Sequence, residues 1–260
     1  METTLYENEN NMLQDKELIN IQFNKCIKGY HLVNTSPINE TIWEDINAVV
    51  FTNIGMEVYS KSDGKHSSGM DIHSSLGRIS NKSAKYSNTN IKSKSKKINS
   101  DKKLDIDINI IKKFDISSYR LTTVCSEKKC GTPELFIAEI NKRKNFDYYS
   151  FIVRDESNEA TILYDWLLIP SDYFILDPSS YSWEPTFGKR AKNKESQVGW
   201  HTNSIHGCSM SITFSMSSQL WIHIEVTPEI KKFIVASGVV NNKPIYNYIQ
   251  LLDYLENHQK

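Results

Sequence analysis

The sequence predicts an α/β protein with a central mixed β-sheet flanked by helices, and three patterns carry this prediction. Ile38–Asn53 has apolar side chains at the i, i+4, i+7 and i+8 spacing of an amphipathic helix. Tyr148–Val153 and Ile162–Ile169 are almost continuously apolar, as expected of strands that are buried on both faces. Thr132–Arg143 begins with Thr-Pro-Glu, a typical helix start, and ends in basic residues.

Weaker patterns complete the predicted fold. Met56–Ser60 and Ile116–Val124 favour short strands. A C-terminal β-hairpin and two helices are expected over Ser209–Met216, Leu220–Val226, Pro228–Ala236 and Ile245–Asn257. Asp177–Gly207 shows no regular period and is expected to be irregular, and residues 1–15 are expected to form a polar arm.

The composition excludes a disordered chain and favours a cytoplasmic one. With 39% apolar and 11% aromatic residues, the chain can bury a sizeable core. No segment approaches the roughly 20 apolar residues of a membrane helix, and the polar, acidic N-terminus is unlike an export signal. We therefore expect no membrane partner, and we expect the four cysteines to be reduced thiols.

Charge is distributed unevenly along the chain. The 31 basic and 31 acidic residues give a formal net charge of zero, which argues against a protein that coats nucleic acid with its whole surface. Between Lys82 and Lys103, however, there are eight lysines and one aspartate, a local charge of +7. We expect one domain over residues 1–260, with a core over about 40–170, a mobile basic insertion over about 87–103 and a C-terminal elaboration over about 177–260.

Two segments near the middle of the predicted core, Met70–His73 and Arg78–Lys85, are expected to form a β-hairpin through a Ser74–Gly77 loop. With that loop, His73 pairs with Arg78. The pairing of every other residue in the hairpin follows from this register, without any assumption about the rest of the fold.

In this register Asp71 lies opposite Ser80, and Lys82 follows on the same face. Directly opposed side chains are ~5 Å apart, so an acid, a hydroxyl and a lysine are expected to lie together. Phosphodiester hydrolysis uses such a group. A carboxylate holds Mg²⁺, which polarises the scissile phosphate and lowers the pKa of a bound water, and a lysine orients that water and offsets the developing charge.

The segments SGMDI (68–72) and SNK (80–82), within an order of helix, three strands, helix and two strands, resemble the PD-(D/E)XK nuclease superfamily and, within it, the Type II restriction endonucleases. The resemblance covers roughly residues 40–170 and implies a restriction-endonuclease-like fold. It also implies that Asp71 is the first metal ligand, that Ser80 stands where a second acid is usual, and that Lys82 is the catalytic lysine. The helix over Thr132–Arg143 would be the crossover between the third and fourth core strands.

Two positions depart from the pattern of that superfamily. Gly69 replaces the usual proline, and Ser80 replaces an acid although a hydroxyl is a poor ligand for Mg²⁺. Some members of the superfamily carry the second acid elsewhere. The candidates are Glu44 on the first helix and Glu57 on the first strand, and Glu44 is preferred because a helix packed against the sheet can direct a carboxylate at the site.

The resemblance implies Mg²⁺-dependent, site-specific cleavage of double-stranded DNA that leaves 5′-phosphates. Cleavage of both strands of a symmetric site favours a homodimer, and a cognate DNA methyltransferase is the expected functional partner. The candidate DNA contacts are Lys85, Lys92, Lys94, Arg120 and Gln219. The alternative is that these are ordinary solvated polar residues.

Two other classes of protein stay open at this stage. A non-catalytic nucleic-acid-binding protein would use the basic loop, and the missing second acid favours it. A zinc-stabilised interaction module would use Cys125, Cys130, His201, His206 and Cys208, but the usual CxxC spacing is absent, so buried free cysteines are expected. Asp165 lies in an apolar strand and is expected either at a sheet edge or beside a base such as Arg154.

Overall fold

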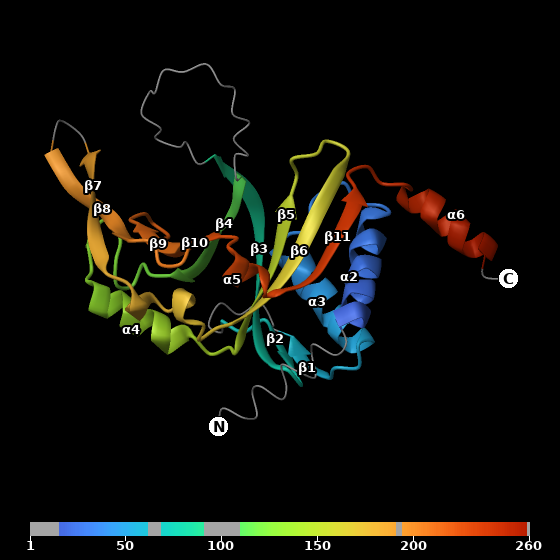
Figure 1. The fold of residues 1–260 in the computed structure, drawn as a ribbon, viewed down its shortest axis with the longest axis horizontal. Helices are drawn as coiled ribbons and strands as arrows, with labels where there is room; N and C mark the ends of the chain where they lie inside the picture. Colours follow the sequence, from blue (N-terminus) through green and yellow to red (C-terminus); the bar gives the residue numbers. More distant parts are fainter. Residues whose placement is uncertain (1–15, 62–68, 91–109, 191–193, 259–260) are drawn as a thin grey trace, which may run out of the picture.

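The computed structural model describes residues 16–61, 69–90, 110–190 and 194–258 (Figure 1). Its strands are β1 (Val58–Lys61), β2 (Ile72–Ser74), β3 (Gly77–Asn90), β4 (Ile110–Arg120), β5 (Tyr148–Asp155), β6 (Thr161–Pro170), β7 (Trp183–Arg190), β8 (Lys194–Thr202), β9 (Cys208–Thr213), β10 (Gln219–Glu225) and β11 (Ile234–Asn241). Its helices are α2 (Lys16–His31), α3 (Glu40–Asn53), α4 (Pro133–Arg143), α5 (Pro228–Lys231) and α6 (Tyr248–His258), and two 3-10 turns cover Phe174–Leu176 and Pro178–Ser180.

The predicted class, a large mixed sheet flanked by helices, is confirmed. Over the described ranges the strands form an 11-stranded sheet in the order β11-β6-β5-β3-β4-β10-β9-β8-β7, with β1 and β2 attached beside the start of β3. β3 and β5 run parallel, and the helix predicted over Thr132–Arg143 is α4, which lies in the chain between these two strands. None of the described helices is long and apolar enough to cross a membrane.

The sheet divides at β3. The middle of β3 pairs with β5, from Ile79 to Lys85, and its last part pairs with β4, from Tyr86 to Asn90. Beyond Tyr86 and its partner Phe114, β4 leaves β3, while its other edge stays paired with β10. The two halves of the sheet therefore diverge from this point, and Figure 1 shows β3 and β4 spreading apart below their shared end.

Each half of the sheet has its own hydrophobic core. α2 and α3 cover β3, β5, β6 and β11, where the rings of Trp43 and Trp166 meet edge to face at 5.4 Å. The second core lies beneath the β4 half and is covered by α4, whose Phe136 contacts Trp183 at 4.7 Å. Aromatic pairs of this geometry stabilise a core by about 0.5–1.5 kcal/mol beyond the area that they bury.

α3 confirms the helix predicted over Ile38–Asn53, but its buried face differs from the expected one. Asn39 caps the helix by accepting a hydrogen bond from the Ile42 N–H at 3.0 Å. Counted from Ile42, the pattern's positions Ile46 and Val50 are buried as expected, but Val49 is 48% exposed. Trp43 and Phe51, outside the pattern, are fully buried. The larger aromatic side chains bury more apolar surface than Val49, and they set the rotation of the helix on the sheet.

The predicted hairpin is present with its predicted register. His73 pairs with Arg78, as expected, and Ser74 pairs with Gly77, so the loop is shortened from four residues to Ser75 and Leu76. Gly77 has a φ of 134°, and a Cβ there would lie 2.9 Å from Asp147 Oδ2. This turn therefore requires glycine.

Three predictions about the fold are wrong. The segment expected to be irregular contains the antiparallel pair β7 and β8. The helix expected over Pro228–Ala236 is limited to the short α5, after which β11 pairs with β6. Ser87–Asn90, expected in the mobile insertion, are the end of β3, and the rest of that insertion lies outside the described residues, as do residues 1–15.

α2, which the sequence patterns did not reveal, packs along the outer strand β11. The Ser237 N–H donates to Asn20 Oδ1 at 3.1 Å, and the Ser237 carbonyl accepts from Asn24 Nδ2 at 2.9 Å. A Cβ at Gly238 would lie 2.6 Å from Ile27 Cδ1. The close approach of this helix to the strand therefore depends on glycine at position 238.

Candidate active site

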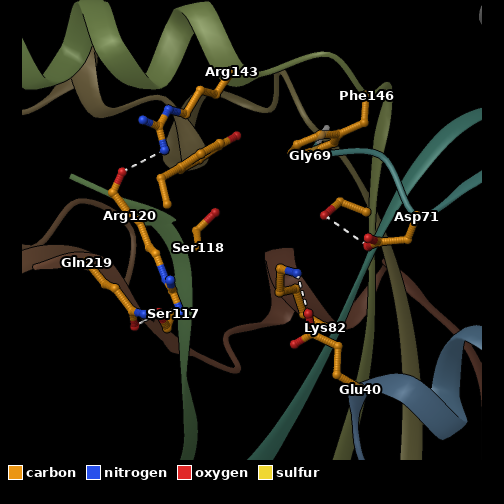
Figure 2. Close-up of a pocket in the computed structure, with 12 residues that line it drawn as sticks. Glu40, Gly69, Asp71, Lys82, Ser117, Ser118, Arg120, Arg143, Phe146 and Gln219 are labelled. Carbon is orange, nitrogen blue, oxygen red and sulfur yellow. Dashed lines mark hydrogen bonds and ion pairs between the residues drawn. The ribbon is translucent and has the colours of Figure 1, made fainter. Parts of the chain in front are cut away.

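A cleft of about 460 Å³ lies where β3 and β4 diverge (Figure 2). One wall is built from β3, the segment before β2 and the start of α3, and the other from β4, β10 and the end of α4. The cleft is lined by Glu40, Gly69, Asp71, Ser80, Lys82, Ser117, Ser118, Tyr119, Arg120, Arg143, Phe146 and Gln219.

Asp71 lies opposite Ser80, as the hairpin register predicted. Its Oδ2 atom accepts hydrogen bonds from the Asn81 main-chain N–H at 2.6 Å and from Ser80 Oγ at 3.4 Å. Burial raises the pKa of Asp71, and the charge of Lys82 and the hydrogen bond from Asn81 oppose this rise. Asp71 is thus a desolvated carboxyl whose charged form is stabilised by groups of β3.

Lys82 binds Glu40, a residue that the sequence patterns did not single out. Its Nζ atom donates to Glu40 Oε1 at 2.7 Å and to the Asn81 carbonyl at 2.8 Å, and its side chain is only 13% exposed. Burial alone would lower the pKa of Lys82, but the charges of Glu40 and Asp71 outweigh this effect and raise it. The ammonium group is therefore charged and fixed in one wall of the cleft.

Glu44, the preferred second acid, lies one helical turn after Glu40 on α3. Burial, followed by the negative charges of Asp71 and Glu40, raises the pKa of Glu44 to about 7. Its carboxyl is close enough to Asp71 for their charges to repel each other, although it does not line the cleft. Glu57, the alternative, is exposed just before β1 and also lies outside the lining.

The opposite wall carries two guanidinium groups and several polar side chains. Arg143 is held by Glu139 and by the Arg120 carbonyl, to which its Nη1 atom donates at 2.9 Å. Ser117 donates to the amide oxygen of Gln219. Figure 2 shows these side chains across the cleft from Asp71, Lys82 and Glu40. An anion in the cleft would meet Arg120 and Arg143 on this wall, and on the other wall Lys82 together with the carboxylates of Asp71 and Glu40.

Behind β3, a buried amide pair joins this strand to α3. Asn47 Nδ2 donates to Asn81 Oδ1 at 2.6 Å and to Ser150 Oγ at 2.8 Å, and both asparagines are fully buried. Asn81 thus contacts Asp71 through its N–H, Lys82 through its carbonyl and α3 through its side chain. One residue connects the groups of the hairpin with the helix that carries Glu40 and Glu44.

The donor atoms at this site suit Mg²⁺. This ion prefers oxygen ligands and is commonly held by one or two carboxylates, while water and substrate phosphate complete its shell. Asp71 and Glu44 supply two carboxylates whose mutual repulsion a divalent cation would offset. Within the described ranges, no three His, Cys, Asp or Glu side chains are grouped for metal binding. The site therefore fits a Mg²⁺ ion that is held by two carboxylates.

The structure brings together most of the predicted site residues. Asp71, Ser80, Lys82, Arg120 and Gln219 all line the cleft. Lys85 does not, and it pairs with Glu156 instead. Lys92 and Lys94 lie outside the described residues.

Two residues that line the cleft, Glu40 and Arg143, were not predicted from the sequence. Only Glu40 had a usable signal, because it lies four residues before Glu44 and therefore on the same helix face.

The cysteines and Asp165 lie away from the cleft. Cys125 and Cys208 are buried free thiols, and burial raises the pKa of each to about 11. Such thiols resist the deprotonation that zinc binding requires, whereas Cys130 is exposed. The expected edge position of Asp165 is wrong, because β6 lies inside the sheet. Among the described residues its carboxylate accepts from Tyr86 at 2.9 Å and from Ser237, and Arg154 pairs with Glu156 instead.

No protein-family model, curated protein sequence or solved structure matches this chain.

Proposed function

We propose that the protein is a Mg²⁺-dependent, site-specific endonuclease of the restriction type, which hydrolyses phosphodiester bonds in double-stranded DNA and leaves 5′-phosphates. The observation that carries this proposal is the contact group of Asp71, Ser80, Lys82 and Glu40 in one wall of a cleft whose other wall presents Arg120 and Arg143. Acids, a buried lysine and facing guanidinium groups are what an enzyme needs to bind a phosphodiester and to stabilise added negative charge on it.

Each residue has a role that follows from its surroundings. Asp71 and Glu44 would hold the cation, which when bound polarises the scissile phosphate and lowers the pKa of a coordinated water. Lys82 would offset the charge that grows on the phosphoryl oxygens, and Glu40 and the Asn81 carbonyl keep its ammonium in place. Arg120 and Arg143 would contact phosphates and thereby position the strand.

The assembly and its genetic setting are part of the proposal. Two copies related by a two-fold axis would cut both strands of a palindromic site. A cell that contains such an enzyme needs a methyltransferase that protects its own copies of the site. The C-terminal part of the chain contributes Gln219 to the cleft, which supports its expected place beside the DNA.

The first experiment is digestion of phage DNA with Mg²⁺, with discrete fragments as the expected result and EDTA as the control. Lys82→Ala should lower the cleavage rate at least ~100-fold, because it removes one preorganised electrostatic partner. Lys112→Ala is the matched control, since Lys112 is also ion-paired, with Asp155 at 2.8 Å, but does not line the cleft. If the two variants cleave at the same rate, the assignment of the site is wrong.

The second experiment uses Asp71→Asn, which keeps an oxygen for the Asn81 N–H but removes the charge. Cleavage should be lost while affinity for DNA stays within about tenfold, because contacts to phosphates from basic residues dominate binding. The rival function, a non-catalytic nucleic-acid-binding protein, is favoured by Ser80 in place of an acid. That function is established if the wild-type protein binds DNA and leaves it intact in Mg²⁺.

A further inference from the structure

The solvent face of β4, β10 and β9 is polar, unlike the face that these strands turn to the core. Along β10, Leu220, Ile222 and Ile224 are buried and alternate with Trp221 and His223. Trp221 is 39% exposed, and the side chain of His223 is 36% exposed. This face is therefore open to a partner.

A hydrogen-bonded row of three side chains crosses these strands. Asp115 on β4 is paired in register with His223 on β10, and its Oδ1 atom lies 2.8 Å from His223 Nδ1. On the other side, Ser211 Oγ on β9 lies 2.8 Å from His223 Nε2. Each side chain is held by its neighbour, so little conformational entropy remains to be lost when the row binds a ligand.

This face is continuous with the cleft. Trp221 is paired in register with Ser117, and Ser117 donates to Gln219. Ser117 and Gln219 also line the cleft. A duplex with its scissile phosphate between Asp71 and Arg120 would therefore also meet the exposed face beside the cleft.

The three residues are hydrogen-bonded in the same order as the Ser-His-Asp triad of a hydrolase. Their surroundings nevertheless favour recognition of DNA over catalysis. Acyl transfer requires N–H donors aimed at the developing oxyanion, and losing one such donor costs about 100- to 1,000-fold in rate. Next to Ser211, the backbones of β9 and β10 pair with each other in a regular antiparallel ladder. Ser211, His223 and Asp115 do not line the cleft, and they lie on an exposed sheet face.

We propose that the solvent face of β4, β10 and β9 reads the base sequence in a groove of the duplex, with Ser211, His223 and Asp115 as the residues that contact base edges. This inference rests on the proposed function, and it identifies the residues that would select the DNA sequence to be cut. Sheet faces are known to read grooves, and the row offers both a hydroxyl and a carboxylate oxygen to the donors and acceptors of base edges. Trp221 adds an apolar surface next to the row.

The test is selection of bound duplexes from a randomised library in EDTA, so that binding is measured without cleavage. The variants are Ser211→Ala and His223→Gln, and the matched control is His258→Gln on α6, where the ring contacts Tyr254 outside this face. The wild-type protein and the control should enrich the same sequence. Each variant should lose about 5- to 100-fold of the preference at one or more base pairs, as expected for a lost contact to a base. Asp115→Asn, which removes the carboxylate charge from the row without changing its shape, replaces any variant that melts early.

The outcomes separate this inference from the proposed nuclease. If the wild-type protein cleaves DNA in Mg²⁺ but both variants select its sequence unchanged, the reading face is wrong and the nuclease stands. If the wild-type protein selects a sequence that His223→Gln loses, yet never cleaves, the reading face stands and the nuclease is wrong. No enrichment by the wild-type protein overturns the inference. Labelling of Ser211 by a fluorophosphonate in the wild type but not in His223→Gln also overturns it, in favour of acyl transfer.

Discussion

The main-chain N–H of Asn81 lies 2.6 Å from Asp71 Oδ2, and the side chain of the same asparagine is bound by Asn47 of α3. The position of Asp71 is therefore tied to the helix that carries Glu40 and Glu44. If the cleft is a metal-dependent active site, this link sets the spacing between its two carboxylates. Such spacing must be held to a fraction of an ångström for efficient catalysis.

Asn81→Ala tests this link. The main-chain bond to Asp71 remains, but the strand loses its hydrogen bond to α3, which is worth about 0.5–1.5 kcal/mol. We expect roughly tenfold slower cleavage with unchanged affinity for DNA. Ser150→Ala is the control, because it removes the other bond of Asn47, and one from Trp166, while the side chain of Asn81 stays bound to Asn47. The link has no positioning role if both variants lose stability and rate in the same proportion.

Glu40→Gln should make Lys82 more reactive towards acetylating reagents. The charge of Glu40 is a main reason that the pKa of Lys82 lies above its usual value, and the burial that lowers it would remain in the variant. More of the amine is then unprotonated at about pH 9, and mass spectrometry should show several-fold faster labelling. Lys61, paired with Asp45, provides an internal control in the same digest. Unchanged labelling of Lys82 would contradict the ion pair.

Glu44→Gln should change how stability depends on pH in the absence of divalent ions. The pKa of Glu44 is about 7 in the folded protein against a usual 4.5. Between these values the folded state holds a proton that the unfolded state has lost, so wild-type stability falls as the pH rises through this window.

The Glu44→Gln variant has no carboxyl at this position, so it does not lose stability in this way as the pH rises. Its free energy of unfolding should match the wild type near pH 4.5 and exceed it by about 1 kcal/mol at about pH 8, a figure reduced for the partial exposure of Glu44. Urea denaturation in EDTA measures this difference. Asp45→Asn corrects for the loss of a surface carboxylate from the same helix, and a difference that does not vary with pH would refute the raised pKa.

Gly238→Ala should destabilise the fold by about 1–3 kcal/mol, because the added methyl group overlaps Ile27 and Asn24 of α2. Gly29→Ala is the matched control, since a Cβ at that helical position meets no atom within 4 Å. This control should raise stability by about 0.5–1 kcal/mol through its better helix propensity. Thermal denaturation compares the two variants, and equal melting temperatures would contradict the packing of α2 on β11.

The parts of the site that the sequence predicted are those fixed by local geometry. A hairpin loop and the two-residue period of a strand are enough to place Asp71 opposite Ser80 and Lys82 on the same face. The partner of Lys82 could not be obtained in this way. Glu40 reaches Lys82 from α3, which is separate from the hairpin. Glu44 lies on the same face of that helix, so the sequence does not show which of the two acids pairs with Lys82.

The errors in the predicted fold arose where tertiary pairing outweighed local pattern. Ile234–Asn241 follows a helix start at Pro228, and its β-branched residues form β11 because β6 offers a free edge. β7 and β8 contain Pro185, Gly188 and Gly199, residues that weaken any strand pattern. The two strands are neighbours in the sequence and pair with each other, so the prediction failed because neither strand has a clear pattern of its own.

The contact of α2 with β11 also limits how copies of the chain can assemble. An outer strand normally presents main-chain groups to which another strand can add. At the centre of β11, Asn20 and Asn24 already satisfy both main-chain groups of Ser237. A second copy cannot add a strand at Ser237 without displacing these two side chains of α2, so the homodimer proposed above would have to form by a contact other than strand addition there.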